Sequence, residues 1–249
     1  ATLSARTAPF GTSDSPLSLI IDSDPGLDDA LAIACAVVRP ELNLLAVTSV
    51  GGNADVHHCT ENALRLLHLY GADNVPVAEG AVGPLAGPLE RATEIHGEGG
   101  IGRTVLPMAT AAARPEGAVS FIASVLRSHA RPVTIAAIGP LTNVALLVQR
   151  HPELLERVAH LAIMGGSIGE GNRTASAEFN IYADPEAAEI LFESGIAVEM
   201  VGWDVSVADA VIDDGLAAEI RAIGPLGEFC IDIQRVLRRF CEESSNMVG

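Results

Sequence analysis

The sequence predicts an α/β protein with a mostly parallel, doubly wound sheet and helices on both faces. Short aliphatic runs rich in Val, Ile and Leu alternate with amphipathic helical segments along most of the chain. The runs are apolar throughout rather than alternately polar, which is typical of parallel strands covered on both sides. Polar residues collect directly after the runs, where the ligand crevice of a Rossmann-like sheet lies, beyond the carboxyl ends of the strands.

Each element follows from its own stretch of sequence. Apolar runs with strand character occupy 17–22, 43–52, 75–80, 133–140, 160–167 and 197–205. Segments with helical periodicity occupy about 27–38, 54–71, 117–130, 141–151 and 184–194. In the last of these, Asp184 is expected to cap the helix and Pro185 to occupy its first turn. The connections 81–104 and 167–183 are long for a compact domain, and long loops of this kind are often functional.

Composition excludes several classes of function. The net charge of −17 disfavours nucleic acids and anionic membranes as partners. No uninterrupted apolar run approaches the roughly 20 residues of a membrane helix. All 15 basic residues are arginine, so no lysine can act as a Schiff base or bind phosphate. The four cysteines form no C-x-x-C pair, which favours a reducing, cytoplasmic location, and Cys35 in its apolar helical run is expected to be buried.

Four carboxylates fall within eight positions after the first strand, in "DSDPGLDDA". They are Asp22, Asp24, Asp28 and Asp29, and no Lys or Arg lies between Arg6 and Arg39. A helix N-terminus stabilises one or two nearby carboxylates by about 0.3–1 kcal/mol each, which leaves the others uncompensated. A hard divalent cation, Ca²⁺ or Mg²⁺, compensates all four because both ions prefer oxygen ligands.

A strand-end D-x-D also occurs in Mg²⁺-dependent phosphatases of the haloacid dehalogenase type. Those enzymes require Thr or Val two places after the second Asp, where this chain has Gly26, and usually a lysine for the phosphate. The phosphatase interpretation is therefore the weakest of those considered.

The cluster resembles the N-terminal signature of the inosine–uridine-preferring nucleoside hydrolase family, D-x-D-P-G-x-D-D-A. The similarity continues through "GGN" (51–53), "IHGEGG" (95–100), "GPLTN" (139–143), "IMGGS" (163–167) and "EGNRTASAEFNIYADPEAA" (170–188). It extends in unbroken order over about residues 17–205. The resemblance implies hydrolysis of the N-glycosidic bond of a ribonucleoside to ribose and free base.

The resemblance also implies a Ca²⁺ cofactor at the floor of the crevice. Its ligands here would be Asp24, Asp29 and the main-chain carbonyl of Ile138, with Asp24 as the general base for the attacking water. Asp28 would face a ribose hydroxyl.

The remaining implied residues surround the sugar and the base. Ribose hydroxyls would contact Asn53, Asn172, Glu178 and Asn180, Met164 would lie beneath the ring, and His96 would lie on the substrate side. Plainer interpretations stay open: Asn53 and Asn172 as turn residues, Met164 as core, His96 as a solvated loop residue. Glu178 and Asn180 are expected to share one side of an extended "EFN" segment. Trp203 suits a base-pocket wall and core packing equally.

The family's last calcium ligand is an Asp directly after a His, and this chain has no such pair after His160. We therefore expect a flexible N-terminal lead-in at 1–16 and a single nucleoside hydrolase-like domain at 17–249 that lacks its C-terminal part. The alternative is a non-catalytic nucleoside- or ribose-binding module with a degenerate metal site. The resemblance further implies a cytoplasmic homodimer or homotetramer in purine or pyrimidine salvage, and it leaves the base preference open.

Overall fold

The computed structural model describes residues 11–239, which form one six-stranded parallel sheet in the order β3-β2-β1-β4-β5-β6. The strands are β1 (Leu17–Ser23), β2 (Leu42–Ser49), β3 (Val77–Ala78), β4 (Val133–Ala137), β5 (Val158–Met164) and β6 (Val198–Val201). The fold class predicted from the sequence is confirmed. The strand order reverses beside β1, which pairs with β2 on one side and β4 on the other, so the ligand crevice is expected at its carboxyl end.

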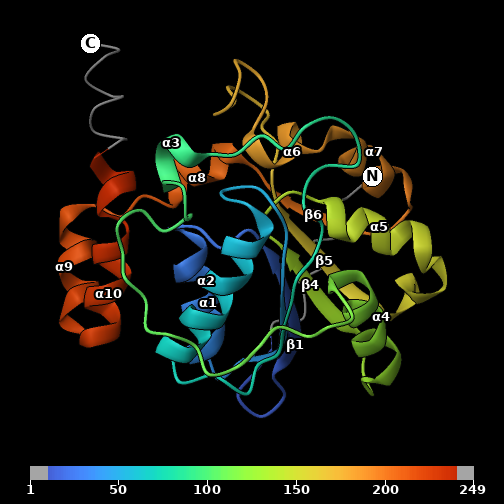
Figure 1. The fold of residues 1–249 in the computed structure, drawn as a ribbon, viewed down its shortest axis with the longest axis horizontal. Coiled ribbons are helices and arrows are strands. Elements are labelled where there is room, and N and C mark those ends of the chain that lie inside the picture. The colour runs from blue at the N-terminus through green and yellow to red at the C-terminus, as the bar shows by residue number, and fades with distance from the viewer. Residues whose placement is uncertain (1–10, 240–249) are drawn as a thin grey trace, which may run out of the picture.

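The helices cover both faces of the sheet (Figure 1). They are α1 (Asp29–Val38), α2 (Val56–Leu69), α3 (Thr93–His96), α4 (Ala118–Ser128), α5 (Thr142–Arg150), the 3₁₀ helix η1 (Pro152–Arg157), α6 (Phe179–Ala183), α7 (Pro185–Glu193), α8 (Trp203–Asp209), α9 (Asp214–Ala222) and α10 (Pro225–Ile233). Helices α1, α2 and α10 lie on one side, and α4, α5 and α7 lie on the other. None of the helices in the described range is long and apolar enough to cross a membrane.

Two apolar cores result from the alternation of side chains along β1. Leu19 and Ile21 join the core beneath α1 and α2, whereas Ile20 joins the core beneath α4 and α5. Because both faces of the strand are covered, its apolar run is continuous. The run stops only where the chain reaches the crevice, at Asp22.

Three local expectations were wrong. The strand predicted at 197–205 ends at Val201, and a helix begins at Trp203 after Gly202. The expected buried thiol of Cys35 is exposed, because this position on α1 faces away from the sheet. The strand predicted at 75–80 shortens to two residues, since Pro76 has no N–H to donate to a ladder. Of the predicted lead-in at 1–16, residues 1–10 lie outside the described residues.

Candidate active site

The carboxyl ends of β1, β2 and β4 converge on Asp24. This residue directly follows β1, and its Oδ2 accepts a hydrogen bond from the main-chain N–H of Asn53, after β2, at 2.7 Å. The side-chain amide of Asn53 donates to the Asp24 carbonyl and to Asp29 Oδ2, each at 3.1 Å. Asn53 therefore joins the first and last aspartates of "DPGLDD", and its amide protons are used in holding them.

Asp29 is the first residue of α1 and is held by the turn before it. Its Oδ1 accepts from Ser23 Oγ and its Oδ2 from the Gly26 N–H, both at 2.7 Å. Asp24 and Asp29 are 1% and 4% exposed, whereas Asp28 between the strand and the helix is exposed. The hydrogen-bond partners of the two buried carboxylates within residues 11–239 are thus amides and a hydroxyl, all neutral.

Burial without a positive partner raises the pKa of both carboxyl groups. Desolvation raises the pKa of Asp24 well above its usual value, and the charge of Asp29 raises it further. Desolvation, together with the charge of Asp28, raises the pKa of Asp29 to about 7, against the lowering effect of the Ser23 and Gly26 hydrogen bonds. This pair of carboxylates is therefore short of positive charge.

Two glycines make room for the Asp24 carboxylate. A methyl group built on Gly139 would lie 2.5 Å from Asp24 Oδ1, and one on Gly52 would overlap Asp24 Oδ2. Close backbone approach of this kind requires glycine. The glycines of "GGN" and "GPLTN" thus bring the loops after β2 and β4 against the same carboxylate.

Asp22, in β1 two residues before Asp24, holds the neighbouring strand and helix in place. Its Oδ1 accepts from Thr48 Oγ1 at 2.5 Å and from Asn143 Nδ2 at 2.9 Å, and Asn143 also donates to the Ser49 carbonyl. Its Oδ2 has no hydrogen-bond partner among the described residues. Burial raises the pKa of Asp22 to about 6, and the two hydrogen bonds partly offset that rise.

The segment expected to be extended, "EFN", is the start of a helix instead. Glu178 caps α6, accepting from the N–H groups of Asn180 at 2.9 Å and Ile181 at 3.2 Å, because a carboxylate satisfies the free amides of a first helical turn. Asn180 is nevertheless buried between the ends of β4 and β5. Its Nδ2 donates to the carbonyl oxygens of Ile138 at 3.1 Å and Met164 at 3.0 Å.

Glu178 and Met164 complete the wall beside β5. Glu178 Oε2 also accepts from the Gly166 N–H at 3.0 Å, and burial raises its pKa. Met164 is half-buried and its sulfur lies 3.4 Å from Asn180 Nδ2.

His96 ends α3 and is buried rather than solvated. Its Nδ1 accepts from the Leu27 N–H at 3.2 Å, which leaves the proton of the neutral ring on Nε2. Burial lowers the pKa of His96 below its usual value, against the opposing effect of the Asp28 charge. The loop that carries His96 is therefore attached to the aspartate turn itself.

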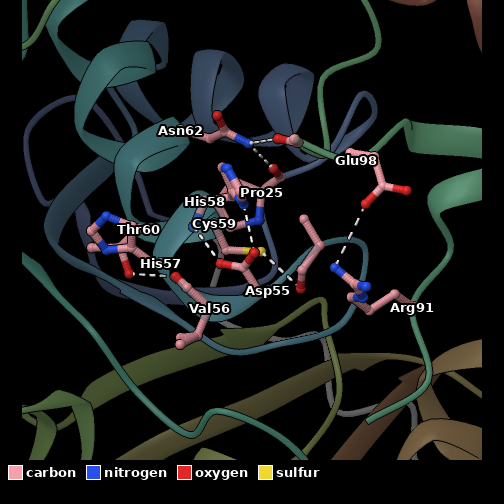
Figure 2. Close-up of polar contacts among 12 residues, drawn as sticks. Pro25, Asp55, Val56, His57, His58, Cys59, Thr60, Asn62, Arg91 and Glu98 are labelled. Carbon is pink, nitrogen blue, oxygen red and sulfur yellow. Dashed lines mark hydrogen bonds and ion pairs between the residues drawn. The ribbon is translucent and has the colours of Figure 1, made fainter.

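Asn62 of α2 is a supporting residue that the sequence did not single out. Its Nδ2 donates to the carbonyls of Pro25 at 3.0 Å and Gly99 at 2.7 Å, so it joins the aspartate turn to the His96 loop (Figure 2). A polar residue on the buried face of a helix was the only available signal, and that signal does not say what the residue contacts.

Within the described part of the chain, Asn172 and Trp203 make no hydrogen bond to the buried aspartates, and both are more exposed than those aspartates. Asn172 is exposed, and its Oδ1 accepts from the Phe179 N–H at 2.8 Å, which fixes the start of α6. Trp203 is half-buried at the start of α8, and its main-chain N–H donates to the Gly166 carbonyl at 2.8 Å.

The oxygen groups at the carboxyl end of β1 suit a hard cation. No three His, Cys, Asp or Glu side chains within residues 11–239 form a metal-binding group. The predicted ligands are two carboxylates, Asp24 and Asp29, and the Ile138 carbonyl, which retains a second lone pair beside its bond from Asn180. Ile138 directly precedes Gly139, which packs on Asp24. Two buried, uncompensated carboxylates with an adjacent carbonyl fit Ca²⁺ chemically.

The fold and site together define an α/β protein with two buried carboxylates at its topological switch point, the carboxyl end of β1. Residues 19–249 match the family profile described as inosine-uridine preferring nucleoside hydrolase. The chain belongs to this family, and it is accordingly an enzyme of the nucleoside hydrolase class.

Known relatives agree with this assignment. The chain is 48% identical over 209 residues to the pyrimidine-specific ribonucleoside hydrolase RihA of Escherichia coli O7:K1, covering 84% of this chain and 67% of the relative. It is 49% identical over the same shares of both chains to RihA of Shigella boydii.

Among solved structures, the purine-preferring ribonucleoside hydrolase from Gardnerella vaginalis superposes with a TM-score of 0.86 at 32% identity, over 93% of this chain and 75% of that one. The inosine-guanosine nucleoside hydrolase superposes with a TM-score of 0.82 at 32% identity, over 90% of this chain and 73% of that one.

Proposed function

We propose that this enzyme hydrolyses the N-glycosidic bond of ribonucleosides with calcium as its cofactor and Asp24 as its general base. The observation that carries the proposal is the buried pair Asp24 and Asp29, joined by Asn53 and surrounded by neutral partners. Two carboxylates at 1% and 4% exposure are costly to ionise unless a cation accompanies them.

Calcium would be held by Asp24, Asp29 and the Ile138 carbonyl. When bound, it supplies a positive charge that orients the ribose hydroxyls and lowers the pKa of the attacking water. Asn180 orients the Ile138 carbonyl through its hydrogen bond, and Asn53 orients the two carboxylates.

Asp24 takes the proton from the attacking water in this mechanism. The carboxylate is fixed on three sides, by the Asn53 N–H, Gly52 and Gly139, so its orientation is set before substrate arrives. As the bond to the base breaks, the ribose gains oxocarbenium character, and electron-rich groups stabilise it. Glu178, Asn180 and Met164, near the carboxyl end of β5, are proposed to serve that purpose, and Asp28 and Asn172 are proposed to bind ribose hydroxyls.

We propose His96 as a neutral donor on the substrate side. Because Nδ1 accepts from the Leu27 N–H, the neutral ring carries its proton on Nε2, and this Nε2–H is the proposed donor to a substrate oxygen or base. A neutral imidazole also avoids placing a second positive charge near the developing oxocarbenium ion.

Pyrimidine ribonucleosides are the proposed preferred substrates. The RihA relatives at 48–49% identity are named pyrimidine-specific, whereas the purine-preferring and inosine-guanosine enzymes share 32%. The free thiols of Cys35, Cys59 and Cys230 suit a reducing compartment, so we propose a cytoplasmic enzyme. A homodimer or homotetramer is proposed from the resemblance alone.

Release of free ribose from uridine, cytidine, inosine and guanosine tests the proposal. We expect ribose from the pyrimidine nucleosides at the higher rates, and a loss of about a hundredfold or more in Asp24→Asn. Folded protein that binds uridine by calorimetry but releases no ribose would instead be a nucleoside-binding module.

A further inference from the structure

Arg173 connects the two long loops that follow β3 and β5. Its guanidinium donates to Glu90 Oε2 at 2.6 Å through Nη2 and to Glu94 Oε1 at 3.1 Å through Nη1. Glu90 lies in the connection that follows β3, and Arg173 lies in the connection that follows β5. The contact therefore joins segments about 80 residues apart in sequence, from opposite sides of β1 in the sheet.

The Arg173 guanidinium makes several contacts at once. One guanidinium reaches two carboxylates and also stacks over the ring of Tyr182, with 5.7 Å from its central carbon to the ring centroid. The Tyr182 hydroxyl in turn donates to Glu90 Oε1 at 3.4 Å. A planar group with several fixed donors holds such an arrangement in a way that a lysine ammonium cannot.

Both ends of the contact are adjacent to proposed substrate residues. Arg173 follows Asn172, and its main-chain N–H donates to the Ala177 carbonyl at 3.0 Å within the same loop. Glu94 belongs to α3, which ends at His96 two residues later. Arg173 and its two glutamate partners are therefore connected through local hydrogen-bonded structure to His96 on one side and Asn172 on the other.

We propose that Arg173 is a positioning residue for substrate binding, which holds α3 with His96 and the Asn172 loop at a fixed separation across the crevice. The proposal rests on the proposed function, because it assigns both residues to the substrate side. Arg173 itself does not touch the reacting atoms. It acts by removing the relative motion of two loops that a ribonucleoside must contact at once.

A merely structural role for Arg173 predicts a different outcome. The side chains of Arg173, Glu90 and Glu94 are 32%, 39% and 52% exposed, and ion pairs this exposed contribute little to global stability. Arg127 and Glu153 provide a matched pair at 3.0 Å, also exposed, between α4 and η1 and away from the crevice. Arg127→Ala therefore serves as the control for loss of an exposed arginine.

Kinetics of ribose release from uridine provide the first test. We expect Arg173→Ala to raise KM about five- to tenfold with kcat within about twofold, since the loops must be ordered by the substrate instead. Arg173→Lys is expected to recover only part of the affinity, and Arg127→Ala to leave KM unchanged. In a Glu90→Gln/Glu94→Gln background, Arg173→Ala should have no further effect on KM.

Amide hydrogen exchange of the substrate-free protein provides a second test that does not depend on activity. The N–H groups of residues 95–97 donate to the carbonyls of Ala92 and Thr93. They should exchange faster in Arg173→Ala than in the wild type, and at the wild-type rate in Arg127→Ala. Unchanged exchange together with an unchanged KM would overturn the proposal. If the wild-type protein releases no ribose, the proposed function fails, and the exchange result alone decides whether Arg173 holds the loops.

Discussion

The main-chain N–H of Asn53 donates to the Asp24 carboxylate at 2.7 Å, while its side-chain amide reaches Asp29 at 3.1 Å. Asn53, a single residue in the loop that follows β2, thus sets the relative position of the two aspartates that follow β1. Asn53 was predicted to bind a ribose hydroxyl. Its protons are occupied by the aspartates, so a contact with a ribose hydroxyl falls to its Oδ1 as acceptor, and Asn53 also fixes the geometry of the proposed calcium ligands.

Asn53→Ala removes the two side-chain bonds and keeps the main-chain bond to Asp24. Because the carboxylates lose the group that aligns them, we expect calcium affinity to fall about 10- to 100-fold, as is typical for residues that orient metal ligands. Calorimetric titration of calcium measures this change. The exposed Gln149 on α5 supplies a control, since Gln149→Ala should bind calcium like the wild type. Equal affinities in all three proteins would contradict this role for Asn53.

Gly52→Ala places a methyl group against the Asp24 carboxylate. Asp24 must move, so we expect ribose release to fall about a hundredfold while the protein stays folded by circular dichroism. Gly99 has open space where a Cβ would project, and Gly99→Ala should retain the wild-type rate. Similar rates in the two variants would show that the close approach at Gly52 is not needed.

Asn62 provides a test of stability. Asn62→Ala leaves the carbonyls of Pro25 and Gly99 without their donor, at an expected cost of about 1–3 kcal/mol in the free energy of unfolding. Asn62→Asp should cost more, because it faces the same two carbonyls with a carboxylate. Urea denaturation measures both variants, and an aspartate variant as stable as the wild type would exclude these hydrogen bonds as the reason for Asn62.

The pH dependence of stability should report the buried His96. Its pKa in the folded protein lies below the ordinary value of 6.5, so the folded state binds fewer protons than the unfolded state just below that pH. The stability associated with neutral His96 is therefore present above pH 6.5 and is lost as the pH falls below it. The His96→Asn variant should not show this decrease in the free energy of unfolding.

Urea denaturation of wild type and His96→Asn at a series of pH values checks this expectation. The difference between the two free energies of unfolding removes the pH dependence that the two proteins share. We expect that difference to shrink as the pH is lowered through 6.5. A difference that is constant with pH would mean that His96 titrates as it does in the unfolded chain.

The sequence was sufficient to predict the parallel sheet, because continuous apolar runs such as those of β1 and β4 encode buried strands locally. It was insufficient where a tertiary contact decides the outcome. The cap that Glu178 provides for α6 depends on the Gly166 amide as well as on its own helix. Asn62 and Arg173 contact partners 37 and about 80 residues away, and no local pattern in a single sequence records such pairings.

The central claim is that Asp24 and Asp29 hold a calcium ion that ribonucleoside hydrolysis requires. The most direct test is release of free ribose from uridine by wild-type protein treated with a calcium chelator and then given calcium back. We predict that the chelator abolishes ribose release and that calcium restores it in the wild type but not in Asp29→Asn. Ribose release at an undiminished rate in the presence of the chelator, from protein shown to be free of calcium, would contradict the account.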